Sequence, residues 1–441
     1  MSAVRTRRIG LSAAIVLGLL AGTARGEDAA APERWSLHGQ FTSVTQYHPD
    51  FHSPYAGPNS LAGESHDDQT NDLTLYAGLG LWPGGAFYLN PEVDQGYGLS
   101  DTLGLAGFSS GEAYKVGSSS PYARLHRAFF RQVFDLGGER QVLAPDANQL
   151  GGARTADNLT LSLGKLSVVD IFDTNQYAHD PRGDFLNWAV IDAGAFDYAA
   201  DSWGYSYGAA AEWSRAWWTL RAGGFALSRQ PNERELQRDF AQFELVAELE
   251  ERHTLYGRDG KLKLLGFLNR GRMADYAEAL AAAAGAAPDV SQVRRYRSRP
   301  GLALNLEQAL APDLGAFLRA SLNDGGKEAY EFTEINRSVS AGLSLNGGRW
   351  SRPGDTVGLA VVANGLSAPA RAYLDAGGLG ILIGDGRLPD YGLEKVAETY
   401  YSLQLLKPLA LSVDYQYIDH PAYNRDRGPV SVFGLRLHLA L

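Results

Sequence analysis

Apolar and polar residues alternate with a period of two at both ends of the chain. In the segment 430–441 every second residue is large and apolar, and Arg436 and His438 lie between these positions. The segment 35–47 alternates in the same way, and its second face carries hydrogen-bonding groups such as Gln40 and Thr42. Because successive side chains of a strand point to opposite faces, both segments are predicted to be strands with one apolar and one wet surface. Such first and last strands favour a closed β-barrel in a membrane, whose polar face lines a water-filled channel.

The same alternation, bounded by turn residues, predicts sixteen strands along the chain. Their predicted ranges are 35–47, 72–82, 86–95, 123–136, 158–166, 202–214, 216–228, 240–252, 261–269, 299–310, 315–323, 335–346, 356–364, 396–406, 410–418 and 430–441. Tight connections, as at 83–85 and 407–409, alternate with long ones, as at 167–201 and 365–395. Bacterial outer-membrane barrels have this arrangement, with the long loops facing outward. We therefore expect an all-β transmembrane antiparallel barrel of about sixteen strands, with some loops folded into the lumen.

Three further features belong to this pattern. The segment 137–157 is long where the alternation requires a short turn, and the sequence offers no explanation for it. The alanine-rich stretch 273–287 predicts a short helix inside a long loop.

Tryptophan favours the interface between bilayer and water, so tryptophans are expected near strand ends. Six of them flank predicted short turns, namely Trp35, Trp82, Trp213, Trp217, Trp218 and Trp350.

The chain begins with the features of a secretory signal peptide. Arginines within 5–8 precede an apolar run at 9–20 and a small-x-small site that ends at Gly26. The apolar run is too short for the ~20 residues that a spanning helix needs. We expect cleavage after Gly26, which leaves 27–441 as one barrel domain and removes four arginines, so that the formal charge changes from −10 to −14. An acidic chain without a long basic stripe argues against nucleic-acid binding.

The inward faces of the predicted strands carry charges of both signs. The period-two rule also places Trp217 and Glu398 on these faces. A pore selective for ions of one sign is expected to show a ring dominated by the opposite charge, so mixed signs favour a neutral, hydroxyl-rich solute such as a sugar. The inward candidates proposed to line the pore are Glu92, Asp94, Arg127, Arg131, Arg221 and Arg319.

The loop 167–187 is unusually rich in charged and polar residues. Its candidates for solute contact are Asp170, Asp173, Asn175, His179, Asp180 and Arg182. One hypothesis folds this loop into the barrel, where it sets the constriction opposite Arg127 and Arg131. The other hypothesis gives the charges of the loop a purely structural role, pinning it to the wall, and both can hold together. No tight His-x-His or His-x-x-x-His spacing occurs in the loop, so no metal is expected there.

Three blocks of the sequence resemble the OprB-type carbohydrate-selective porins. They are 158–189, which begins NLTLSLGKLSVVDIFDTNQ, 385–403, which reads DGRLPDYGLEKVAETYYSL, and 423–438, which reads YNRDRGPVSVFGLRLH. The resemblance extends from the first predicted strand to the last. It implies a single-chain outer-membrane barrel that admits small sugars by diffusion, narrowed by inward-folded loops, without catalysis and without a bound cofactor. Many such barrels end in Phe, whereas this chain ends in Leu441.

Other functions remain as alternatives. A pore for sugar acids or other organic anions would need a throat dominated by its arginines, with the carboxylates held in ion pairs. An outer-membrane barrel hydrolase is disfavoured, because the Gly-x-Ser-x-Gly pattern at 107–111 lies in a loop with no helix after it. An adhesin or envelope tether would show a plugged lumen. The expected partners are small sugars, outer-membrane lipid and lipopolysaccharide, the last near the arginines of 294–299, in a monomer or a homotrimer.

Overall fold

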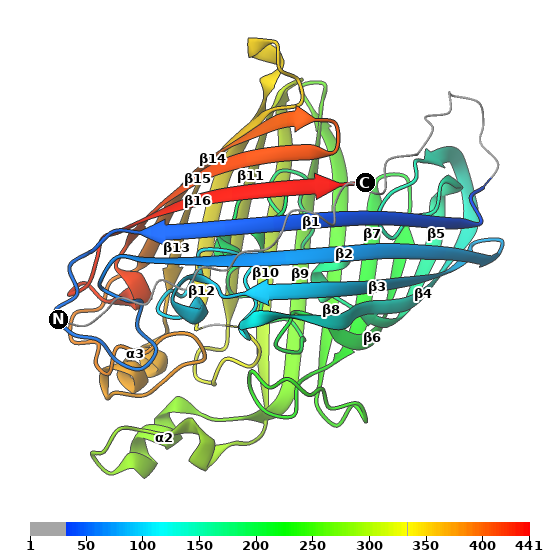
Figure 1. The fold of residues 1–441 in the computed structure, drawn as a ribbon. Helices are drawn as coiled ribbons and strands as arrows, with labels where there is room; N and C mark the ends of the chain where they lie inside the picture. The colour runs from blue at the N-terminus through cyan, green and yellow to red at the C-terminus, as the bar shows by residue number, and fades with distance from the viewer. Residues whose placement is uncertain (1–31, 333) are drawn as a thin grey trace.

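The computed structural model describes residues 32–332 and 334–441, which form a closed antiparallel barrel of sixteen strands (Figure 1). Each strand pairs with its neighbours in sequence, and β1 closes the barrel against β16. In that seam Gln40 lies opposite Ala440, and Tyr47 lies opposite Phe433. The predicted fold class is confirmed, and each of the sixteen predicted strands overlaps an observed one. The predicted leader 1–26 lies outside the described residues.

The strands vary greatly in length. The first eight are β1 (Trp35–His48), β2 (His66–Trp82), β3 (Gly85–Gly96), β4 (Ser118–Leu143), β5 (Gly152–Leu166), β6 (Ser206–Ser214), β7 (Trp218–Ala226) and β8 (Phe243–Leu255). The second eight are β9 (Arg258–Met273), β10 (Arg295–Ala311), β11 (Leu314–Asn323), β12 (Arg337–Asn346), β13 (Thr356–Gly365), β14 (Glu394–Leu406), β15 (Leu409–Asp419) and β16 (Val430–Ala440). Short turns lie at the end of the barrel where β1 begins, and long loops gather at the other end (Figure 1).

The predicted alternation is present in the observed strands. On β16, Phe433 and Leu435 are exposed on the outer surface, whereas Gly434 and Arg436 are buried inside. Trp35, Trp82, Trp213 and Trp217 are exposed near the short turns, as expected for rings at a bilayer interface. Trp217 lies in the turn before β7 with 61% of its surface exposed, and it lines a cavity together with Gln176 and Tyr177.

Helices are short and lie in the connections. They are α1 (Trp188–Ile191), α2 (Tyr276–Ala283) and α3 (Ala368–Asp375), with 3-10 turns η2 (Leu99–Thr102), η3 (Val168–Asp170), η4 (Val290–Val293), η5 (Gly347–Trp350) and η6 (Pro421–Tyr423). The predicted helix within 273–287 is confirmed as α2, and the Asp275 carboxylate caps it by accepting from the backbone N–H groups of Ala277 and Glu278. None of the helices described is long and apolar enough to cross a membrane.

Several observed strands begin or end at other residues than predicted, and two of these differences have clear local reasons. Strand β6 begins at Ser206, not at 202, because the Asp201 carboxylate accepts from the N–H groups of Trp203 and Tyr205 and folds that segment into a turn. The unexplained segment 137–157 consists of the continuing ends of β4 and β5, which stay paired as far as Leu143 and Gly152. The barrel therefore extends at its short-turn end into one long hairpin.

Candidate functional site

The loop between β5 and β6, residues 167–205, folds into the barrel and is called L3 below. Its aromatic side chains Phe172, Phe185, Trp188 and Phe196 are buried in the core of the molecule. Phe185 packs edge-on against Tyr400 of β14, with ring centroids 5.0 Å apart. The hypothesis that part of this loop enters the lumen agrees with this geometry.

Arg319 of β11 holds L3 against one side of the wall. Its Nε lies 3.2 Å from Oδ1 of Asp173, and its Nη1 and Nη2 donate to the backbone carbonyls of Val190 and Ala178, both at 2.8 Å. Arg319 and Asp173 are each only 1% exposed. Because water does not reach this pair, the ion pair and its hydrogen bonds fix the middle of the loop.

Strands β14 and β16 hold L3 with one carboxylate and one guanidinium. Glu398 of β14 accepts from the N–H groups of Leu186 at 2.5 Å and Asn187 at 3.1 Å. Arg436 of β16 donates to three backbone carbonyls within 181–184 at 2.6–3.1 Å. Inward-facing charges on the strands thus satisfy backbone groups of a buried loop, which would otherwise lack partners.

Two other predicted site residues, Arg221 and Asn175, lie near the contacts that hold L3 against the wall. Arg221 of β7 is paired with Glu212, Glu248 and Glu250 at 2.7–3.0 Å. The Asn175 side chain donates to Oδ1 of Asn305 at 2.7 Å. Asn175, Asp173, Arg319 and Arg221 are therefore placed against the wall as buried loop supports.

Arg182 connects another part of L3 to the first strands of the barrel. Its Nε lies 3.1 Å from Glu112, and its Nη2 lies 3.3 Å from Asp72 and 3.5 Å from Glu92. Its Nη1 donates to the Tyr76 hydroxyl at 3.4 Å. Burial raises the pKa of Glu112, in the loop 97–117, although the Arg182 guanidinium acts to lower it. Arg182 therefore joins this edge of L3 to strand β2, strand β3 and a second loop.

Arg127 of β4 and Asp170 of L3 form a second ion pair on this side. The guanidinium binds both carboxylate oxygens, with Nε to Oδ2 at 2.7 Å and Nη2 to Oδ1 at 2.6 Å. Loss of hydration opposes ionisation of Asp170, yet the Arg127 guanidinium lowers the pKa of this carboxyl below its usual value. Such two-pronged contacts have a fixed geometry, so this pair fixes the start of L3 against β4.

His179 is partly buried on L3, and the next residue, Asp180, is exposed. Nδ1 of His179 lies 3.6 Å from Oδ1 of Asp192. Burial acts to lower the pKa of His179, but the Asp192 carboxylate outweighs it, and the pKa is raised above its ordinary value. Asp180 is exposed and has no cation within 4.0 Å among the described residues. Both groups can therefore meet a solute directly.

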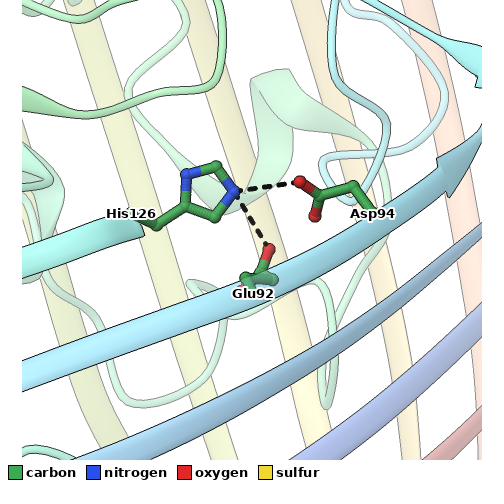
Figure 2. A group of neighbouring side chains, drawn as sticks. All are labelled: Glu92, Asp94 and His126. Atoms are coloured by element: carbon green, nitrogen blue, oxygen red, sulfur yellow. Dashed lines mark hydrogen bonds and ion pairs between the residues drawn. The ribbon is translucent and has the colours of Figure 1, made fainter. Parts of the chain in front are cut away.

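A buried histidine that the period-two rule places outward also lies at this site. A bulge opposite Pro91 pairs Asn90 with Arg127 and Pro91 with Leu125, so His126 has no partner on β3 and turns inward beside Arg127. It approaches Glu92 and Asp94, both predicted site residues (Figure 2). The proline inside a predicted strand is the signal that could have indicated this bulge.

The end of the β4–β5 hairpin supplies a further contact at the short-turn end. Arg131 donates to the carbonyl of Asn148 at 2.9 Å, and the side chain of Asn90 donates to Oδ1 of Asn148 at 2.8 Å. Leu150 packs beside Gly78, where an added Cβ would lie 3.2 Å from the leucine side chain. The turn 144–151 therefore folds back toward the barrel mouth beside β2, β3 and β4.

Basic residues gather around a cavity of about 960 Å³ near the long-loop end of β4. Its lining includes Arg124, Lys165, Arg229, Arg234 and Arg238, together with Asp201, Glu235, Tyr122, Trp203 and Tyr207. The guanidinium of Arg124 lies 3.4 Å from the centre of the Trp203 ring. Arg124 and Lys165 pair with Asp201, and Arg229 pairs with Glu235. The arginines within 294–299 are likewise each paired with an acid, namely Glu328, Glu278 or Asp197.

Comparisons with known proteins agree with this architecture. A family described as carbohydrate-selective porin, OprB family, matches residues 59–441. The high-pH structure of Pseudomonas putida OprB covers 92% of this chain and 94% of its own length, with a TM-score of 0.67 and 14% identity. The outer-membrane channel DcaP of Acinetobacter baumannii covers 95% of this chain and 100% of its own, with a TM-score of 0.50 and 11% identity. No curated protein sequence matches the chain.

The family match spans most of the chain, and the structural matches share its closed barrel. Family and fold both indicate a channel and not an enzyme. The chain belongs to the OprB family of carbohydrate-selective porins, and it is a sugar channel of the Gram-negative outer membrane.

Proposed function

We propose that small neutral sugars cross this channel between L3 and the wall formed by β1 to β4 and β16. One observation carries the proposal: both guanidinium groups at this edge of L3 are held by carboxylates and do not stand as free charges. Arg127 binds Asp170, and Arg182 is surrounded by Asp72, Glu92 and Glu112. Paired charges hydrogen-bond sugar hydroxyls but exert a weaker field on ions than a ring of one sign.

Weak and multiple contacts are what a diffusion channel requires, because a solute that bound tightly would block it. The aromatic ring of Tyr205 lies 4.9 Å from the Arg127 guanidinium, and the Tyr76 hydroxyl accepts from Arg182. An aromatic face beside polar groups suits the apolar face and the hydroxyl edge of a pyranose. Arg127, Arg131, Asp170, His179, Asp180 and Arg182 are therefore proposed to contact the solute.

Removing one member of the Arg127–Asp170 pair tests this account. We expect Asp170→Asn to shift the reversal potential in a salt gradient toward anion preference, because Arg127 is left uncompensated. The double variant with Arg127→Gln is expected to return close to the wild-type value. Planar-bilayer recordings of single channels check both expectations, and a double variant as anion-selective as the single one would contradict the pairing.

The channel is expected to become more anion-selective as the pH falls through the pKa of His179. Below that raised pKa the ring is protonated and adds positive charge to the opening, and above it the charge is lost. The groups that surround the ring include Asp192, Asp173 and Arg319. Reversal potentials of wild type and His179→Gln between about pH 5 and pH 8 check this. The variant should lack the step that has its midpoint above the ordinary histidine value.

The turn 144–151 is proposed to narrow the mouth at the short-turn end. Leu143 pairs directly with Gly152, so a two-residue Asn-Gly turn can replace these eight residues and keep the hairpin register. We expect the shortened channel to conduct more than wild type at every salt concentration. Gln149→Ala, which keeps the turn, serves as the control. Equal conductance of the shortened and wild-type channels would show that the turn leaves the pore width unchanged.

A second candidate function is the uptake of sugar acids. The observation that favours it is the cavity described above, where five basic side chains face two acids beside three aromatic rings. A solute that carries a carboxylate would be attracted to this cavity before it reaches L3. Uptake of glucuronate that exceeds uptake of glucose, and that falls in an Arg234→Gln, Arg238→Gln variant, would favour this candidate.

A further inference from the structure

Glu92 and Asp94 of β3 and His126 of β4 converge on one point inside the barrel (Figure 2). Nε2 of His126 lies 3.5 Å from Oε1 of Glu92 and 3.2 Å from Oδ2 of Asp94. The side chains of His126 and Glu92 are fully buried, and that of Asp94 is 4% exposed. The three groups thus share a site from which bulk water is excluded.

Negative charge exceeds positive charge around this point. Asp72 and Glu112 lie beside Glu92 and Asp94, and the guanidinium of Arg182 is shared among Asp72, Glu92 and Glu112. Buried carboxylates are costly unless they are paired with cations or neutralised. One guanidinium cannot balance four carboxylates, so a further positive charge is required if they are to remain ionised.

One other observation indicates where that charge sits. Oδ1 of Asp94 is buried and has no hydrogen-bond partner among the described residues. An unpartnered carboxylate oxygen on a side chain that already approaches the imidazole of His126 is what a bound cation would satisfy.

The two distances from the imidazole nitrogen fit a metal ion, and the three ligand atoms lie within 4.8 Å of one another. A tetrahedral Zn²⁺ bound about 2.0–2.1 Å from nitrogen and oxygen ligands holds neighbouring ligand atoms about 3.4 Å apart. The two distances from His126 Nε2, 3.2 and 3.5 Å, lie on either side of that value. An imidazole with two carboxylates suits Zn²⁺ better than Ca²⁺ or Mg²⁺, which prefer oxygen ligands.

We propose that Glu92, Asp94 and His126 form a binding site for a divalent transition-metal cation of the Zn²⁺ type. The remaining oxygen of Glu92 accepts from Thr74 and faces Arg182, while Tyr114 donates to Oε1 of Glu92 at 2.6 Å, so these groups orient the ligand. The ion ties β3 to β4 and supports the partners of Arg182 at the edge of L3. This last role depends on the proposed function of the opening, whereas the binding of metal does not.

The test measures metal bound to the folded, full-length porin, prepared without a histidine tag. The protein is stripped with a chelator, incubated with ZnCl₂, dialysed and analysed for metal content by mass spectrometry. About one Zn²⁺ per chain is expected, and the affinity should fall by at least about tenfold in His126→Gln and in Asp94→Asn. His253→Gln is the matched control, because its Nδ1 lies 2.7 Å from Glu251, and within the part of the chain that the structure describes this pair belongs to no group of three possible metal ligands.

Folding is verified for every variant by the shift in gel mobility between heated and unheated samples. Two variants are used so that failure of one to fold leaves the other to decide. The proposal is overturned if folded wild type binds no Zn²⁺ above the His126→Gln level, or if it binds Ca²⁺ but not Zn²⁺. An unaltered conductance with Zn²⁺ bound would contradict only the supporting role at L3.

Discussion

Replacing Arg319 with methionine is expected to destabilise the barrel interior and release L3. The change leaves the buried Asp173 carboxylate without its cation and removes the donors to the carbonyls of Val190 and Ala178. Removing one partner of a buried ion pair costs about 3–5 kcal/mol. We expect a lower temperature for loss of the folded band on unheated gels, together with a larger and noisier single-channel conductance.

The contribution of charge can be separated from that of packing with two further variants. Asp173→Asn combined with Arg319→Met leaves no isolated buried charge and should recover part of the lost stability. Arg349→Met removes an exposed pair with Asp313 and is expected to leave the stability nearly unchanged, because water screens the pair. If Arg319→Met had the same unfolding temperature and the same single-channel noise as Arg349→Met, L3 would not depend on the contacts of Arg319.

Replacing Arg182 with methionine is expected to produce the largest change in selectivity. Asp72, Glu92 and Glu112 would lose their shared cation while remaining at the edge of the opening. The added negative field should attract cations and repel anions, and we expect the K⁺ to Cl⁻ permeability ratio to rise severalfold. Reversal potentials in KCl gradients measure this ratio directly.

Asp180→Asn is a suitable control for this measurement. Asp180 is exposed on the same loop and lacks a close cation among the described residues, so its loss should shift selectivity slightly and in the opposite direction. An Arg182→Met channel with an unchanged permeability ratio would place the solute path away from this edge of L3.

Alternation along the chain was sufficient to predict the sixteen strands and most inward faces. The outer surface of the barrel must be apolar at every second position, so Phe433, Leu435 and similar residues mark the register on their own. The alternation did not predict the strand end at 137–143. Both faces of this hairpin end are exposed, and a strand without a buried face has no hydrophobic period.

The roles of individual charges depended on contacts that sequence does not specify. Arg319 and Asp173 are 146 positions apart, and nothing in the local sequence of either residue indicates the other. The inward face of Arg319 was predictable, but whether L3 or water would meet it was not. The inward position of His126 could not be read from the alternation, since a single extra residue at the bulge reverses the faces of the strand around it.

Permeation of uncharged sugars tests the central claim most directly. Proteoliposomes containing the folded porin would be diluted into isotonic solutions of a hexose, a disaccharide, a hexuronate and a non-sugar polyether of matched size, and their swelling rates compared. We expect the hexose to give the fastest swelling, faster than the polyether of equal size. The hexuronate is expected to enter more slowly than the hexose. Equal rates for hexose and polyether, or no swelling with any solute, would contradict a sugar path between L3 and the wall.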